Sequence, residues 1–263
     1  MQSLVDFVVH RFPEFEILKG NKKKAQVFLY AHSDEILRDL DGQQIVDYIG
    51  SAYDATAEEY DKDSHTQDFA PNFFNFVGRL NKGSLVLDLG CGHGRDSLYM
   101  LEQGMRVIPY DISFNLMQIT AEKVQNHENR VPSMVIGDFT GSNTGFRDEE
   151  FDAIWACTSL LVHTPLFRLD RAVGVWAKTL KKRGLFGVSY FNPNFEGFKQ
   201  GYNIRMSTTG EIKIFVSPGE EQVKRAFNNA GLILEEENKT DYVDKPKEID
   251  RSEFFVDAIY MKK

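Results

Sequence analysis

The sequence has little of three features that would each define a class of protein. It contains 2 cysteines among 263 residues, too few for a disulfide framework, so we expect a reducing, cytoplasmic environment. No uninterrupted apolar run approaches the roughly 20 residues that a membrane-spanning helix needs. Near the start of the chain, Asp6 and His10 stand where a signal peptide would keep an unbroken apolar core. We therefore expect no membrane contact.

The chain also lacks an excess of positive charge. Its 31 Lys and Arg residues are outnumbered by 39 Asp and Glu residues, which gives a formal net charge of −8. Proteins that bind nucleic acid usually present a broad positive field to the phosphates, so nucleic acid is an unlikely partner, although net charge does not exclude a local basic patch. The hydrophobic content of 42% suffices for the core of one large domain, or of one domain with an appendage.

Beyond Gly83 the sequence alternates short apolar runs with helical patterns. The apolar runs predict five strands, at residues 84–90, 105–112, 132–139, 151–158 and 184–191. Such alternation predicts parallel strands joined by right-handed crossovers, with helices on both faces. Two more strands, at 232–242 and 253–263, have a connection too short and charged for a crossover helix, so we expect them to pair antiparallel at one edge. The predicted fold class is thus α/β, with a doubly wound, mostly parallel seven-stranded sheet.

The sequence before this region has a different pattern. We expect residues 1–50 to form an N-terminal extension or helical cap, and residues 51–263 to form the main domain. Two stretches rich in tyrosine and phenylalanine, 43–63 and 69–81, predict helices that lean on the mouth of the sheet. An insertion at 192–216 contains two apolar segments around the turn sequence STTGE, which predicts a hairpin.

Three glycines lie where the first predicted strand meets its helix. Gly90, Gly92 and Gly94 form the pattern G-x-G-x-G. Dinucleotide sites instead have G-x-G-x-x-G, with a pyrophosphate at the helix N-terminus. Asp96, in the first turn of the helix, would repel a pyrophosphate and suits a ligand with an amino group. A glycine triplet alone is also compatible with a simple tight turn.

A second acidic position makes a ligand the favoured interpretation. Asp111 ends the second predicted strand about 20 residues further on, where an acidic residue is expected to bind ribose hydroxyls. Adenosine with a positively charged amino-acid tail and no phosphate satisfies this combination. The pattern therefore favours S-adenosylmethionine as the cofactor.

The sequences VLDLGCGHGRDS (86–97), PYDIS (109–113), GDF (137–139) and FDAIWACTSLL (151–161) together resemble the class I S-adenosylmethionine-dependent methyltransferases. Within that family the chain is similar to the broad group that acts on small molecules. The similarity extends from about Tyr53 to the C-terminus. It implies a Rossmann-like fold, an antiparallel C-terminal hairpin, and an enzyme that transfers a methyl group to a small-molecule acceptor.

The resemblance also implies which residues contact the cofactor. They are Asp88 and the backbone of Gly90, Cys91, Gly92 and Gly94 at the methionine portion, Asp111 at the ribose, Ile112 beside the adenine, Asp138 at the adenine amino group, Phe139 beside the ring, and Ala156 and Cys157 near the sulfonium. Tyr53, in YDATAEEYDKD, is implied to approach the transferring methyl group. Simple packing on a helix face is the alternative for Tyr53, and the favoured interpretation for Tyr60.

His163 is the candidate base that would take a proton from the acceptor. It follows the fourth predicted strand at the rim where open α/β sheets bind ligands. The family often has SLLH there, whereas this chain has SLLVH, and this offset of one residue can turn the ring away. A capping or half-buried histidine is the equal alternative. His93, inside the glycine loop, is expected to touch the cofactor edge.

Acceptor contacts are expected from the two segments that cover the site. The candidates are Tyr53, Tyr190, Phe191, Tyr202 and Arg205, and Arg205 would hold a carboxylate or phosphate unless it is an ordinary surface arginine. The histidines and cysteines lack the spacing of metal ligands, so we expect no metal. If the first and fourth strands are neighbours, the Cys91 and Cys157 thiols lie close together, although two unrelated buried cysteines are the favoured interpretation.

Three alternative functions stay open at this point. They are a tRNA- or protein-modifying methyltransferase, a regulator that binds S-adenosylmethionine without turnover, and, least favoured, a nicotinamide oxidoreductase. The sequence does not identify the acceptor, the role of residues 1–50 or the oligomeric state.

Overall fold

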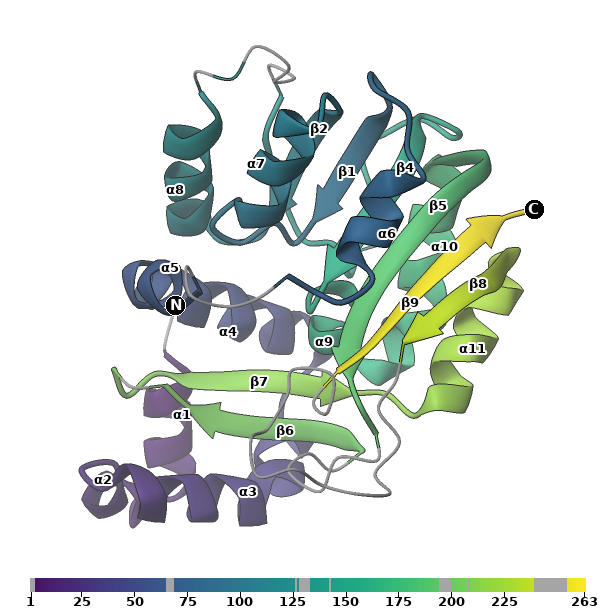
Figure 1. The fold of residues 1–263 in the computed structure, drawn as a ribbon. Coiled ribbons are helices and arrows are strands. Elements are labelled where there is room, and N and C mark those ends of the chain that lie inside the picture. Colours follow the sequence, from purple (N-terminus) through teal and green to yellow (C-terminus); the bar gives the residue numbers. More distant parts are fainter. Residues whose placement is uncertain are drawn as a thin grey trace, which may run out of the picture.

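A computed structural model describes residues 3–64, 69–125, 127, 133–141, 143–193, 200–207, 209–238 and 255–263. Its centre is a seven-stranded sheet in the order β3-β2-β1-β4-β5-β9-β8 (Figure 1). The strands are β1 (Leu85–Leu89), β2 (Arg106–Asp111), β3 (Val135–Ile136), β4 (Phe151–Cys157), β5 (Leu180–Phe191), β8 (Leu232–Asn238) and β9 (Phe255–Lys262). From β3 to β5 the neighbours are parallel, whereas β9 is antiparallel to both β5 and β8. The predicted fold class is confirmed.

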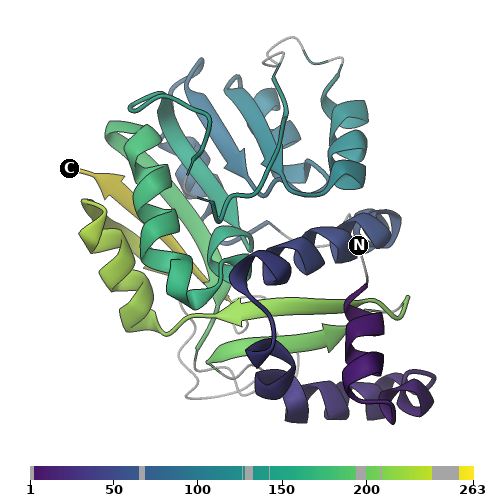
Figure 2. The same ribbon diagram turned by 180° about the vertical axis from the view of Figure 1, so that it is seen from behind.

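Alternate residues of the central strands enter two hydrophobic cores, one on each face of the sheet. On β1, Val86 packs into the core under α6 (Phe73–Gly78) and α7 (Arg95–Glu102). The next residue, Leu87, packs into the core under α10 (Leu169–Thr179) and α11 (Glu220–Asn229). Figures 1 and 2 show these two pairs of helices on opposite faces. Both faces of the central strands are therefore covered, as their nearly continuous apolar sequences predict.

A separate hydrophobic core lies beyond the carboxyl ends of the parallel strands, where the arrowhead of β1 points in Figure 1. It combines the N-terminal helices with the inserted hairpin, and we call this unit the cap. Its elements are α1 (Leu4–Arg11), α2 (Phe15–Leu18), α3 (Lys22–Arg38), α4 (Gly42–Ala55), β6 (Gly201–Met206) and β7 (Ile212–Ser217). The strands β6 and β7 pair antiparallel, so the predicted hairpin is confirmed.

The predicted elements differ from the observed ones mainly at their ends. The strand predicted at 132–139 is only Val135–Ile136 in the described residues, because Asp138 accepts a hydrogen bond from the Thr140 N–H (2.7 Å) and begins a turn. A 3-10 turn, η1 (Leu166–Arg168), leads directly into α10. Among the helices that the structure describes, none combines the length and the apolar character that crossing a membrane demands.

Candidate cofactor and acceptor site

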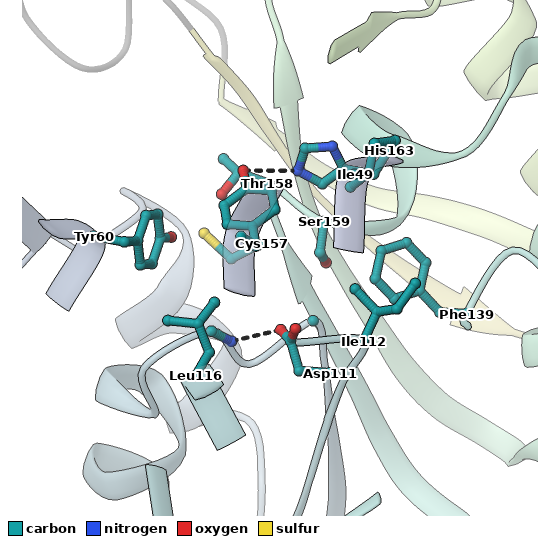
Figure 3. Close-up of a pocket in the computed structure, with 13 residues that line it drawn as sticks. Ile49, Tyr60, Asp111, Ile112, Leu116, Phe139, Cys157, Thr158, Ser159 and His163 are labelled. Atoms are coloured by element: carbon teal, nitrogen blue, oxygen red, sulfur yellow. Dashed lines mark hydrogen bonds between the residues drawn. The ribbon is translucent and has the colours of Figure 1, made fainter. Parts of the chain in front are cut away.

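A pocket lies at the carboxyl ends of β1, β2 and β4, between the sheet and α4 of the cap (Figure 3). Its empty volume is about 390 Å³, which includes space open to solvent. The residues that line it are Ile49, Tyr53, Tyr60, Gly90, Gly92, Asp111, Ile112, Leu116, Phe139, Cys157, Thr158, Ser159 and His163. Eight of these are cofactor or catalytic residues that the sequence predicts.

The glycine loop requires glycine for both conformation and space. Gly90, Gly92 and Gly94 have φ values of 79°, 55° and 80°, a region that side-chain-bearing residues rarely adopt. A Cβ on Gly90 would lie 2.2 Å from the Ser159 Cβ, and one on Gly94 would lie 2.7 Å from a Thr120 carbon. The loop therefore presents bare backbone to the pocket.

Asp111 connects this loop to the second strand. Its carboxylate accepts hydrogen bonds from the Gly92 N–H (2.8 Å, drawn in Figure 3) and from the Ser113 N–H (2.9 Å). Burial raises the pKa of Asp111, and these backbone donors oppose that rise. Each carboxylate oxygen can accept a further hydrogen bond, so Asp111 can hold the loop and bind a ligand hydroxyl at the same time.

Two other acidic residues lie outside the pocket lining. Asp88 accepts a hydrogen bond from the Ser97 hydroxyl (2.5 Å), and burial together with the nearby Asp96 raises the pKa of Asp88. Asp96 accepts hydrogen bonds from the Trp155 indole N–H and from Arg95 Nε, both at 2.8 Å. These two carboxylates are therefore engaged with side chains of the protein beneath the loop.

Tyr53 and His163 are brought together across the pocket from 110 positions apart in the sequence. The Tyr53 hydroxyl lies 3.1 Å from His163 Nε2, and the tautomer of the ring decides which group donates. Burial, with a smaller contribution from the positive charge of Lys213, lowers the pKa of His163 to about 4, although a backbone interaction with Ile214 opposes this shift. Burial raises the pKa of Tyr53. Both side chains are consequently neutral near pH 7.

The remaining predicted cofactor residues are divided between the pocket and its surroundings. Cys157 lines the pocket, whereas the Cys91 thiol is directed at the Met117 sulfur (3.5 Å) on α8 (Phe114–Val124). β1, which precedes the loop with Cys91, and β4, which carries Cys157, are neighbours as expected. Ala156 is part of the hydrophobic core, and Asp138 is engaged with Thr140. His93 packs its ring against Tyr60 at 5.6 Å between centroids.

The four predicted acceptor residues other than Tyr53 lie outside the pocket lining. Tyr190 is fully buried in the core of the sheet, and Phe191 packs against Phe215. Tyr202 accepts a hydrogen bond from the Leu166 N–H at 3.2 Å. Arg205, on β6, interacts electrostatically with Tyr30 of α3.

Five lining residues are absent from the predicted set, and two of them carried a readable signal. Ile49 precedes Tyr53 by one helical turn and so shares its face of α4. Tyr60, for which the sequence favours packing, belongs to the same motif as Tyr53. Thr158 has a φ of 49°, an uncommon conformation for a β-branched residue, and Ser159 donates a hydrogen bond to the Leu89 carbonyl. Nothing in the sequence near Thr158 and Ser159 indicates either feature.

Comparison with known families identifies the domain that holds this pocket. Residues 86–184 match the family model described as a methyltransferase domain. This match supports the family that the sequence motifs resemble, and it includes the glycine loop, Asp111 and His163.

The chain is also similar to individual proteins. Over 111 residues it is 32% identical to a demethylmenaquinone methyltransferase of Thermobifida fusca (strain YX), a match that covers 42% of this chain and 44% of that protein. The chain therefore matches less than half the length of this curated relative.

Solved structures share the fold over most of the chain. The structure of Burkholderia thailandensis 1,6-didemethyltoxoflavin-N1-methyltransferase, with 1,6-didemethyltoxoflavin and S-adenosylhomocysteine bound, has a TM-score of 0.63 at 18% identity, covering 85% of this chain and 91% of that one. The structure of the 4+2 cyclase SpnF has a TM-score of 0.60 at 17% identity, covering 84% and 96%. At these identities the likeness establishes the fold alone.

Proposed function

We propose that the protein is an enzyme that transfers a methyl group from S-adenosylmethionine to a small-molecule acceptor. The observation that carries this proposal is the pocket itself. The glycine loop and Asp111 build one side of it, and Tyr53 of the cap meets His163 of the sheet domain at another. The pocket thus has one wall suited to an adenosyl cofactor and a facing wall suited to an acceptor.

The residues present fit a phosphate-free adenosyl cofactor. Asp111 would bind the ribose hydroxyls, and three apolar side chains, Ile112, Leu116 and Phe139, would enclose the adenine. Gly90 and Gly92 line the pocket with bare backbone, along which the methionine portion would lie. When bound, the cofactor supplies a methyl group already activated for displacement.

The protein's own contribution is alignment and the exclusion of water. Holding two reactants in line can supply several kcal/mol of a barrier, and α4 lines the pocket with the apolar Ile49 and with Tyr53. His163, with its pKa lowered to about 4, is a weak base near neutral pH. We therefore assign it to holding the Tyr53 hydroxyl in position, with the acceptor proton leaving to solvent or to a group on the acceptor.

A small acceptor is supported by the enclosure of the pocket and by the relatives. The Thermobifida relative is named for a quinone-type small molecule, and the Burkholderia structure contains a small heteroaromatic ligand. The net charge of −8 disfavours tRNA.

The test is methyl transfer from S-adenosylmethionine labelled with deuterium in its methyl group. The protein is incubated separately with a small-molecule extract, with tRNA and with a protein fraction, and the products are analysed by mass spectrometry. We expect a labelled small molecule with the wild-type chain and none with Asp111→Ala. Label in tRNA or protein instead would overturn the proposed acceptor class. Cofactor binding without any methyl transfer would favour a binding regulator or an enzyme that catalyses a different reaction. The SpnF structure, which shares the fold, is that of a 4+2 cyclase.

A further inference from the structure

A second cleft lies at the amino ends of β1, β4 and β5, at the edge of the sheet that faces away from the cap (Figure 1). Its empty volume is about 500 Å³, which includes space open to solvent. Its lining contains four cationic side chains and one acidic side chain, which are Arg79, Lys181, Lys182, Arg183 and Asp152. This local charge is opposite in sign to the formal net charge of the chain, −8. We call this site the basic cleft.

Two of the four cations have acidic partners. Lys181 Nζ lies 2.7 Å from one carboxylate oxygen of Asp152, and the other oxygen of Asp152 accepts a hydrogen bond from the Leu85 N–H (2.8 Å). Arg79 Nη2 lies 2.7 Å from a carboxylate oxygen of Glu236 on β8. These two pairs fix the side walls of the cleft and leave its charge to the other two cations.

Lys182 and Arg183 supply that charge. Both are exposed, and neither forms an ion pair with any residue that the structure describes. The acidic residues 148–150, which precede β4, are not among the residues that line the cleft. The basic cleft therefore holds two positive charges that the described part of the protein does not neutralise.

A bulge in β5 presents these two side chains. The register between β4 and β5 shifts so that Asp152 alone lies opposite residues 181–184. Gly184 makes this close approach possible, because a Cβ there would lie 2.8 Å from Leu180 Cγ and 2.9 Å from the Asp152 carbonyl oxygen. Bulges of this kind redirect side chains away from the regular alternation of a strand.

The backbone of Arg183 is an independent indication that its side chain is used. Its φ of 62° lies in the left-handed region, which favours glycine because a Cβ crowds the neighbouring carbonyl. A side-chain-bearing residue held in such a conformation is found most often where the residue has a function.

We propose that the basic cleft binds a phosphate monoester, on a small molecule or a lipid headgroup, between Lys182 and Arg183. A guanidinium can bind two phosphate oxygens at once, and an ammonium adds a compact charge. Two positive charges match a monoester, which carries a charge of about −2 near pH 7, better than a singly charged diester. Asn81 and Ser84, in the same lining, have neutral groups that can donate further hydrogen bonds. This site goes beyond the proposed function, since it lies at the opposite end of the strands from the cofactor pocket.

The test compares each monoester probe with a singly charged counterpart. Calorimetric titrations of the full chain use phenyl phosphate and benzenesulfonate at matched ionic strength. Co-sedimentation uses phosphatidylcholine vesicles that contain either phosphatidate, a monoester, or phosphatidylglycerol, a diester. We expect at least one monoester to bind about tenfold more tightly than its counterpart. Binding of phenyl phosphate would identify a free ligand as the source, and binding of phosphatidate vesicles alone would identify a lipid headgroup.

Variants connect this preference to the bulge. Arg183→Gly removes one charge and suits the φ of 62°, so it should keep the fold. Combined with Lys182→Met, it should weaken monoester binding by about tenfold or more. The matched control combines Lys22→Met with Lys23→Met, which also removes two exposed positive charges, from the start of α3 in the cap. The control should bind the probes as the wild type does.

The outcomes decide between a built site and a general effect of charge. Equal affinity for both members of each probe pair would overturn the proposed site, and so would a monoester preference that survives in the double variant. An equal loss of binding in the control would also overturn it. Should the double variant fail to fold, Arg183→Gly alone decides by the same comparison. Absence of S-adenosylhomocysteine binding would contradict the proposed function and leave the basic cleft unaffected.

Discussion

At the scale of single residues, the site depends on side chains that meet two demands at once. Asp111 fixes the glycine loop through the Gly92 N–H and also lines the pocket. Gly90 satisfies a positive φ and also leaves space for Ser159. Substitutions at such positions are expected to affect folding and ligand binding together, so each needs a control that separates the two effects.

Gly90→Ala should cost about 3 kcal/mol of unfolding free energy, because a left-handed conformation and a clash with Ser159 add together. Gly83→Ala is the control, since Gly83 has a φ of 82° but nothing within 4 Å of an added Cβ. The control should lose only about 1 kcal/mol. Urea unfolding of both variants measures the difference. Equal losses of unfolding free energy would show that the close approach of Ser159 does not require glycine at position 90.

His163 should make the stability of the protein depend on pH. Its pKa is about 4 in the folded chain and about 6.5 when unfolded. Between these values the unfolded state binds more protons, so stability falls as the pH decreases from 6.5 to 4, by up to about 3 kcal/mol. His163→Gln lacks this contribution, so its curve of unfolding free energy against pH should be flatter across that window. Parallel curves for the two proteins would contradict the burial of a neutral imidazole.

At the scale of elements, the cap is held together by contacts between segments far apart in the sequence. The Gln26 side chain on α3 donates to the Ile204 carbonyl (2.9 Å) and accepts from the Met206 N–H (3.0 Å), so it pairs with the edge of β6. Asp54, at the end of α4, accepts hydrogen bonds from the Ser113 hydroxyl and the Asn115 N–H at the start of α8. The Gln26 bonds thus join two segments of the cap, and the Asp54 bonds join the cap to the sheet domain.

Gln26→Ala should destabilise the protein by about 1–3 kcal/mol, because a partly buried N–H and C=O lose their partner together. Gln43→Ala removes an exposed glutamine that bonds only to Asp47 in its own helix, and it should change stability by no more than about 0.5 kcal/mol. Thermal and urea unfolding compare the two. Equal unfolding free energies for Gln26→Ala and Gln43→Ala would mean that the Gln26 hydrogen bonds do not stabilise the packing of α3 against the hairpin.

At the scale of the whole molecule, the sequence predicts the sheet well because each strand has a strong local signal. The alternation of strands and helices predicts the parallel strands. The charged connection in the tail predicts the two antiparallel strands. The glycine loop and Asp111 are readable for the same reason, since both lie at the end of a strand.

The acceptor side of the pocket is less predictable because it depends on tertiary contacts. Tyr190 lies near the rim by sequence but packs in the core, and Tyr53 meets His163 from 110 positions away. The cap is built from the N-terminal helices and from an inserted hairpin beyond residue 200. Neither segment has a local sequence pattern that predicts that the two pack together.

The most direct measurement for the central claim is calorimetric titration of the wild-type chain and of Asp111→Asn with S-adenosylhomocysteine and with NADH. The account predicts that the wild type binds S-adenosylhomocysteine and shows no heat with NADH, and that Asp111→Asn binds S-adenosylhomocysteine at least tenfold more weakly. Binding of NADH alone, or equal S-adenosylhomocysteine affinity in both proteins, would contradict it.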